Sequence, residues 1–260
     1  MSATPTIRND LSTDSLVQLA NRQIAAIHVK GFYPAEQCQA ISEKAIAHDK
    51  LEFYAKEKVK TVARLHIPHA DTDGHPEVKK AYHENAIASI HDTRSIFYPH
   101  ISPVDHLKLL LQEFWPSGAN LQHLDGRKCF SGALRVFWPK TAEFFPHYDR
   151  LDEESSASEL EHMGEQLGAN IYLQTPSSGG DLQMWLREAT PDEKITIREV
   201  EGLEPEDVGP PKLVIHPEEG DLIIMSTRML HAVTPSADSH RVSTGTFIGV
   251  HGDRPLSYWS

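Results

Sequence analysis

His147 and Asp149 offer an imidazole and a carboxylate from one short segment, Pro-His-Tyr-Asp, at the end of an expected strand. Side chains two positions apart on a strand point to the same face, so these two can reach one metal ion. The pattern His-x-Asp also occurs by chance, and either residue could be structural. The pair therefore predicts a metal site only if a third ligand comes from another segment.

His231 is the expected third ligand, about 80 residues further along the chain. It follows a turn at Gly220-Asp221 and a buried strand, LIIM, and it precedes a turn that contains proline. Two histidines and one carboxylate form the facial triad that binds Fe(II) and leaves adjacent coordination positions open. The three residues together predict a mononuclear iron site that can take oxygen and a co-substrate.

Arg241 lies ten residues after His231, and Ser243 follows two positions later on the same face of the expected strand. A 2-oxo acid can bind iron through its keto and C1 carboxylate oxygens, which leaves its distal carboxylate to pair with a cation. Because arginine forms bidentate pairs with carboxylates, we expect Arg241 and Ser243 to bind 2-oxoglutarate. Asn170 and Tyr172 alternate in ANIYLQ and would contact 2-oxoglutarate if they face the metal, whereas the opposite phase would leave them structural.

Arg135, Trp138 and Arg150 are candidate substrate-binding residues around the expected iron site. Arg135 lies on the strand before the His-x-Asp segment and could bind a carboxylate or pair with an acidic neighbour. Trp138 is a candidate for the rim of a pocket, and Arg150 directly follows Asp149. Since single arginines commonly form ordinary ion pairs, these residues do not fix a substrate.

The elements that must position these residues change in kind near residue 117. Before it, residues 24–32 look extended, and residues 35–50, 76–98 and 103–115 have the apolar spacing of helices. The last two of these helices begin at a proline, which suits the first turn of a helix. The N-terminal half is therefore expected to be largely helical.

After residue 117, short runs rich in Val, Ile, Phe and Tyr alternate with turn residues. They predict strands at 131–139, 142–149, 169–176, 180–186, 194–200, 212–217, 220–226 and 243–251. Residues 151–168 form an acidic interruption, either a loop or a short helix. Many short strands without intervening helices favour an antiparallel sandwich or barrel.

The composition predicts one soluble domain. The chain has 260 residues, a formal charge of -12, and no apolar stretch of the roughly 20 residues that cross a membrane. This charge argues against a nucleic-acid partner, and the N-terminus does not look like a secretory signal, so we expect a cytoplasmic protein. Cys38 and Cys129 are too few for a disulfide framework and are expected to be buried thiols. The sequence is compatible with a homodimer and does not determine the oligomeric state.

The motifs PHYD, GGDLQMW and GDLIIM, followed by H-x-V-x-P and HRVS, resemble the Fe(II)/2-oxoglutarate-dependent oxygenase superfamily. The resemblance implies a mainly β fold with supporting helices: a double-stranded β-helix (cupin-like jelly roll) over about 117–254, preceded by helical support over about 1–116, in one domain of 1–260. It implies Fe(II) held by the three ligands, with 2-oxoglutarate and O2 as co-substrates. Length and the GGDLQMW segment are similar to the carrier-independent free-amino-acid hydroxylases and halogenases.

Asp149 favours hydroxylation within that group, because the resemblance implies that halogenating members replace this carboxylate by a small residue. The expected reaction hydroxylates an unactivated C–H bond of a free amino acid or derived metabolite and releases succinate and CO2. An arginine of the N-terminal half holds the substrate carboxylate in the relatives, which makes Arg64 a candidate, and the neighbouring His66 and His69 could fold over the pocket mouth. The alternatives are a prolyl-hydroxylase-like enzyme acting on a peptide or protein and a non-catalytic jelly-roll binding protein.

Overall fold

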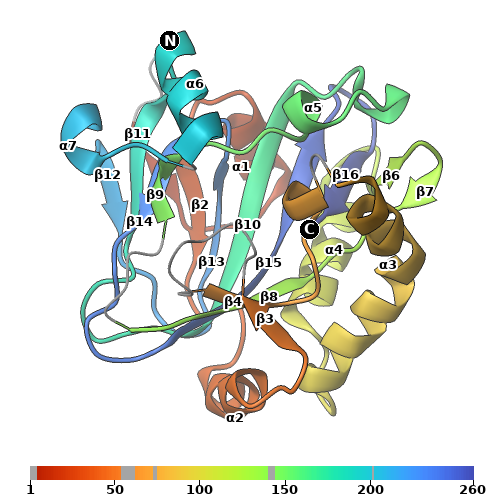
Figure 1. The fold of residues 1–260 in the computed structure, drawn as a ribbon, viewed down its shortest axis with the longest axis vertical. Helices are drawn as coiled ribbons and strands as arrows, with labels where there is room; N and C mark the ends of the chain where they lie inside the picture. Colours follow the sequence, from red (N-terminus) through yellow and green to blue (C-terminus); the bar gives the residue numbers. More distant parts are fainter. Residues whose placement is uncertain (1–4, 54–61, 73–74, 140–143, 201) are drawn as a thin grey trace.

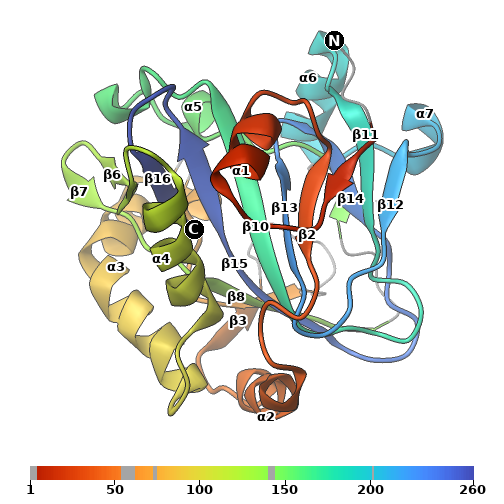
Figure 2. The ribbon, with the colours of Figure 1, turned by 180° about the vertical axis from the view of Figure 1, so that it is seen from behind.

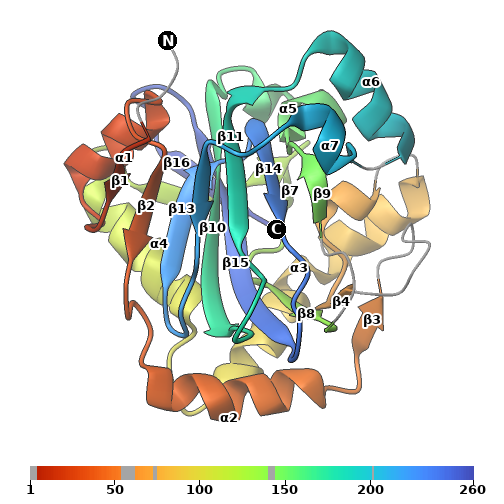
Figure 3. The ribbon, with the colours of Figure 1, turned by 90° about the vertical axis from the view of Figure 1, so that its left-hand side faces the viewer.

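Two β-sheets that face each other form the centre of the molecule, and helices cover the outer face of the larger sheet (Figures 1 and 2). The computed structural model describes residues 5–53, 62–72, 75–139, 144–200 and 202–260. The larger sheet has the order β1-β2-β13-β10-β15-β8-β4-β3, with β16 and β5 attached through β15, and the smaller sheet has the order β12-β11-β14-β9. Figure 3 shows the smaller sheet lying beside the larger one.

The strands are β1 Ile7–Arg8, β2 Ala26–Val29, β3 Leu51–Phe53, β4 Val62–Leu65, β5 Ala119–Leu121, β6 His123–Leu124, β7 Arg127–Lys128, β8 Ala133–Phe137, β9 Phe144–His147, β10 Glu165–Gln174, β11 Leu182–Glu188, β12 Leu213–Ile215, β13 Leu222–Ser226, β14 Met229–Val233, β15 Arg241–Val250 and β16 Leu256–Trp259. The helices are α1 Thr13–Ala20, α2 Ala35–Ile46, η1 His69–Thr72, α3 Pro76–Phe97, α4 Pro103–Phe114, α5 Leu151–Glu154, η2 Ser158–Leu160, α6 Pro191–Val200 and α7 Pro205–Val208.

Strand β10 separates two hydrophobic layers because its side chains alternate between its faces. Ile171 and Leu173 pack in the core under helices α1, α2 and α4. Tyr172 points the other way and packs between the two sheets, with Met184 of β11 and Ile223 of β13. The alternation therefore fixes which residues of the larger sheet face the smaller sheet.

The helices begin where local sequence stabilises their first turn. The Ser12 side chain accepts a hydrogen bond from the backbone of Ser15, and the Ser15 side chain accepts one from the backbone of Ser12, which starts α1. Helices α3 and α4 begin at Pro76 and Pro103, as predicted. Apolar residues of α1, α2 and α4 then cover the outer face of the larger sheet.

The prediction of a strand at 194–200 is wrong, because these residues belong to helix α6. The Thr190 hydroxyl accepts a hydrogen bond from the Glu193 backbone, and the Glu193 carboxylate accepts one from the Thr190 backbone. This capping box favours a helix over the strand that Ile195 and Ile197 suggest. Ile195 is exposed, so the β-branched residues here do not form a buried strand face.

The predicted class, mainly β with supporting helices, is confirmed. The acidic interruption at 151–168 contains the short helices α5 and η2 before β10 begins at Glu165. Strands β2 and β4, which come from the N-terminal half, pair with β13 and β8 of the larger sheet. Residues 142–143 of the strand predicted at 142–149 lie outside the described residues, and β9 covers Phe144–His147, so that Tyr148 and Asp149 follow the strand.

Within the ranges that the structure describes, no helix is long and apolar enough to cross a membrane.

Candidate iron and co-substrate site

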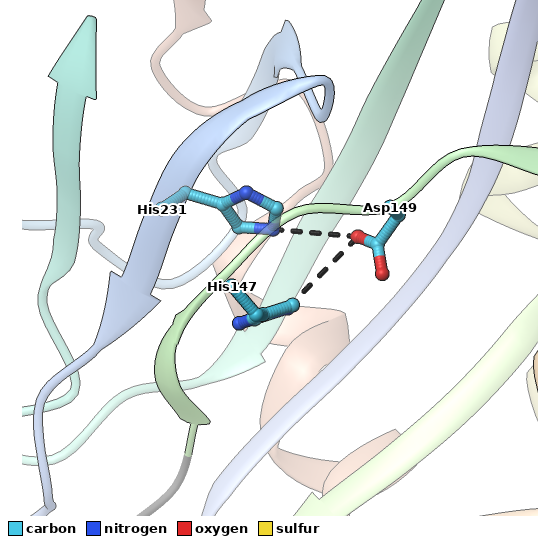
Figure 4. A group of neighbouring side chains, drawn as sticks. All are labelled: His147, Asp149 and His231. Carbon is cyan, nitrogen blue, oxygen red and sulfur yellow. Dashed lines mark ion pairs between the residues drawn. The ribbon is translucent and has the colours of Figure 1, made fainter. Parts of the chain in front are cut away.

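The two strands β9 and β14 bring His147, Asp149 and His231 together (Figure 4). His147 and His231 are partners in the antiparallel register of these strands, and their ring centroids are 4.3 Å apart. Asp149 follows β9, and its Oδ2 lies 3.4 Å from Nε2 of His231 and 3.9 Å from Nε2 of His147. One ligand atom from each residue lies within 4.8 Å of the others, so a single ion can be bound by all three.

Both imidazoles are oriented by backbone carbonyl groups. Nδ1 of His147 donates a hydrogen bond to the Phe145 carbonyl at 2.7 Å, and Nδ1 of His231 donates one to the Met229 carbonyl at 2.9 Å. A carbonyl oxygen can only accept, so each Nδ1 carries the proton and each Nε2 keeps its lone pair. Such second-shell hydrogen bonds are typical of metal-binding histidines. The donor set therefore fits an Fe(II) ion.

The electrostatic environment keeps two of the three ligands, His147 and Asp149, in the form that binds a metal at neutral pH. Desolvation lowers the pKa of His147 to about 4, and His231 and Arg135 act in the same direction. Desolvation raises the pKa of Asp149, but the neighbouring imidazoles of His231 and His147 outweigh it, so that the pKa lies below its usual value. His147 is thus neutral and Asp149 anionic, as metal coordination requires.

A row of candidate side chains crosses the larger sheet opposite the triad. Tyr172 of β10 pairs with Ser243 of β15, Ser243 pairs with Arg135 of β8, and Arg135 pairs with Arg64 of β4. Directly paired residues on neighbouring strands point to the same face, so all four share the face that Tyr172 presents to the smaller sheet. Asn170 lies two residues before Tyr172 on this face. Their roles in binding stay predictions.

Arg241 begins β15 at one end of this interior face and is 4% exposed. Its Cζ lies 3.9 Å from the centre of the Phe137 ring and 5.8 Å from that of Tyr172. Stacking on aromatic rings holds the planar guanidinium in a defined orientation. Arg241 and Ser243 can therefore present a fixed cation and a hydroxyl to a dicarboxylate.

The other substrate candidates have partners of their own. Arg64 is buried, and its Nη2 lies 2.9 Å from Oδ2 of Asp71 in η1. Arg150 pairs with Asp152 at 2.6 Å in the acidic segment. Trp138 packs against His240 and Phe53, with ring centroids 5.0 and 5.3 Å away. Their contribution to substrate binding stays a prediction. The charge of Arg135 acts on both His147 and Asp149.

A small cavity beside Asp149 has room for about one water-sized group. Its lining residues come from η1, α5, β10, β15 and β16 and the segment after β9: His69, Ala70, Asp149, Leu151, Glu154, Gln166, Phe247 and Trp259. His69 was expected near the pocket mouth. Glu154, Gln166 and Phe247 were missed, although Phe247 has the same phase on β15 as Arg241 and Ser243.

Glu153 connects helix α5 with helix α6 through hydrogen bonds, close in sequence to Asp149. Its carboxylate accepts hydrogen bonds from Tyr148 at 2.8 Å and from Lys194 and Arg198 at 2.9 Å each. Burial raises the pKa of Glu153, but these donors outweigh it and hold the pKa at about 2, below the ordinary 4.5. The depressed pKa means that the carboxylate stabilises the fold in its anionic form.

We expect Glu153→Gln to lower the free energy of unfolding at pH 7 by about 1 kcal/mol, since water screens this partly exposed network. The difference in the free energy of unfolding between wild type and the variant is fully present above about pH 4.5, and it disappears as the pH falls toward about 2. Urea unfolding at a series of pH values measures it, with exposed Glu161→Gln as the control. A difference that stays constant from pH 7 to pH 3 would contradict the stated role of the carboxylate.

Three comparisons with known proteins bear on this site. The model of a family described as carrier-protein-independent halogenase WelO5 matches residues 7–260. A curated relative, L-isoleucine 3(1)-dioxygenase of Pantoea ananatis (strain AJ13355), is 26% identical over 147 residues, which are 52% of this chain and 48% of the relative. The chain thus spans about half the length of that relative.

Solved structures of similar fold include an N-substituted L-amino acid dioxygenase from Burkholderia ambifaria AMMD, with a TM-score of 0.65 and 15% identity over 100% of both chains. A structure of an N-substituted L-amino acid dioxygenase from the same organism in complex with alpha-KG has a TM-score of 0.63 and 16% identity, and covers 95% of this chain and 90% of that one. At these identities the likeness supports a shared fold.

Proposed function

Because the chain belongs to the carrier-protein-independent halogenase WelO5 family, we propose that it hydroxylates an unactivated C–H bond of a free amino acid or an amino-acid-derived metabolite. Membership of this family confirms the predicted superfamily of Fe(II)/2-oxoglutarate-dependent oxygenases, and with it the expected enzyme class and co-substrates. The reaction would consume 2-oxoglutarate and O2 and release succinate and CO2.

One observation carries the proposal of hydroxylation over halogenation: the carboxylate of Asp149 converges with the two Nε2 atoms of His147 and His231. This carboxylate would take the coordination position that a halide needs. His147, Asp149 and His231 would hold the iron, which supplies oxygen activation when bound. Arg241 and Ser243 would bind the distal carboxylate of 2-oxoglutarate, and Asn170 and Tyr172 would line its site.

The similarity to L-isoleucine 3(1)-dioxygenase supports a free amino acid as substrate. Of the predicted alternatives, a peptide-modifying enzyme would need a longer groove. The cytoplasmic location, the single domain and the homodimer stay predictions.

We expect purified protein with Fe(II), 2-oxoglutarate and O2 to release succinate in the presence of at least one amino acid. A succinate-release screen across proteinogenic amino acids, N-substituted amino acids and small peptides measures this, and mass spectrometry detects a product heavier by one oxygen atom. The same reactions with chloride in excess serve as the halogenation control. A product that gains chlorine instead of oxygen, or release only with peptides, would contradict the proposal.

A further inference from the structure

Asp149 lies outside the strands that hold the two histidines of the triad. His147 and His231 pair with each other across β9 and β14, whereas Asp149 follows two residues after the end of β9. The side chain of Asp149 is 29% exposed, against 17% for His147 and 6% for His231. Since the backbone hydrogen bonds of the sheet fix only the strand residues, the Asp149 carboxylate needs another anchor to reach the metal position.

The turn between β13 and β14, formed by Thr227 and Arg228, supplies this anchor. The Asp149 N–H donates a hydrogen bond to the Thr227 carbonyl at 2.8 Å, and the Thr227 hydroxyl donates one to the Asp149 carbonyl at 3.2 Å. Thr227 is 2% exposed, so water competes little for these bonds. Because hydrogen bonds are directional, two of them to one residue fix its backbone and thus the direction of its side chain.

Strand β10 keeps Thr227 itself in place. The Thr227 N–H donates a hydrogen bond to the Gln166 carbonyl at 3.0 Å, and the Thr227 hydroxyl lies 3.4 Å from the same oxygen. The methyl group of Thr227 packs over Gly168, where an added Cβ would lie 2.6 Å from Cγ2 of Thr227. Residue 168 therefore has to be glycine for the threonine to keep its position.

Other contacts hold the rest of the segment after β9. The Leu151 N–H donates a hydrogen bond to the Gln166 side chain at 2.8 Å, and Nη2 of Arg228 lies 3.0 Å from Oδ1 of Asp152. These contacts do not involve the Thr227 hydroxyl. A variant that lacks only this hydroxyl should therefore keep the segment attached and the fold intact.

We propose that Thr227 is a positioning residue of the metal site, and that its hydroxyl holds Asp149 so that the carboxylate points at the position shared with His147 and His231. The inference rests on the proposed function, because it takes Asp149 as a metal ligand. It deepens that function by naming the residue that keeps the third ligand in place. Thr227 acts on the metal only through Asp149.

Co(II) titration of the metal-free protein, followed by visible absorption, measures affinity and coordination geometry without turnover. Thr227→Val keeps the shape of threonine without its hydroxyl, so the Co(II) affinity should fall about tenfold, as for loss of a group that orients a ligand. The spectrum at saturating Co(II) should shift from that of wild type toward that of Asp149→Ala. Thr227→Ser keeps the hydroxyl and should restore the affinity and the spectrum of wild type.

Thr244→Val is the matched control, because it makes the same chemical change at another buried threonine. Thr244 lies on β15, and its hydroxyl has no hydrogen-bond partner among the described residues. This variant should bind Co(II) like wild type. An equal loss of affinity in Thr244→Val and Thr227→Val would show a general effect of valine in the core and would overturn the inference.

A double-mutant cycle separates positioning from a packing defect. With Asp149→Ala in place, no carboxylate remains to be positioned, so Thr227→Val should leave the residual Co(II) affinity unchanged. A packing defect would weaken Co(II) binding by the same factor in both backgrounds. Gly168→Ala is an independent variant: its Cβ should displace Thr227 and weaken Co(II) binding, and Thr227→Ser, which lacks Cγ2, should relieve this loss.

The inference would be overturned by equal Co(II) affinity and spectra in Thr227→Val and wild type, or by equal effects of Thr227→Val with and without Asp149. Wild-type affinity in Gly168→Ala, or a loss that Thr227→Ser does not relieve, would also contradict it. The expected Co(II) results without succinate release from any amino acid would leave the role of Thr227 standing and refute amino-acid hydroxylation. Succinate release with unchanged Co(II) binding in Thr227→Val would leave the hydroxylase standing and refute the role of Thr227.

Discussion

Replacing His231 by alanine is expected to abolish iron binding and succinate release. His231 is 5% exposed, and its Nε2 points at the position shared with Asp149 and His147. Loss of a second-shell partner typically costs 10- to 100-fold in metal affinity or activity, so loss of a direct ligand should exceed about 100-fold. Metal analysis of the purified variant gives iron per chain, and succinate release gives turnover.

A surface histidine provides the control for this variant. The side chain of His216 is 77% exposed, and it pairs with Asp181 rather than with any residue of the triad. His216→Ala should keep both the iron and the turnover of wild type. If His231→Ala also retained full iron and full turnover, the metal site would have to lie elsewhere in the chain.

Alternation along strands explains why so much of the candidate site could be predicted from the sequence. A period of two fixes the relative face of His147 and Asp149, and of Arg241 and Ser243, without knowledge of the partner strands. The buried run before His231 could only be a strand of the core. The register that places His147 opposite His231, however, depends on the pairing of β9 with β14, which is a tertiary contact.

The parts that were missed depend on local capping and on distant contacts. The β-branched residues at 194–200 predicted a strand. The capping box formed by Thr190 and Glu193 outweighs this pattern, and the residues belong to helix α6. The cavity beside Asp149 combines His69 of η1 with Trp259 of β16, which no short segment of sequence can bring together. Local patterns therefore indicated the ligands better than the pocket.

Arg241→Ala is expected to raise the KM for 2-oxoglutarate roughly 100-fold and to leave the KM for the amino acid nearly unchanged. The physical reason is that the distal carboxylate of 2-oxoglutarate would be buried without a cation, and breaking a buried charge pair costs about 3 kcal/mol or more. Steady-state succinate release at a range of 2-oxoglutarate concentrations measures the change. Arg241→Lys keeps a point charge but loses the bidentate geometry, so its KM should lie between those of wild type and the alanine variant.

Because Arg241 also stacks on Phe137, a change in KM alone does not separate co-substrate binding from a packing defect. A comparison of 2-oxoglutarate with a 2-oxo acid that lacks the distal carboxylate separates the two explanations. 2-Oxopentanoate has the same carbon chain as 2-oxoglutarate and lacks the distal carboxylate, so wild type should strongly prefer 2-oxoglutarate, and Arg241→Ala should lose most of this preference. A packing defect would weaken both acids alike and keep their ratio. An unchanged ratio would therefore move the co-substrate carboxylate to another cation of the interior face, such as Arg135, whose charge acts on His147 and Asp149.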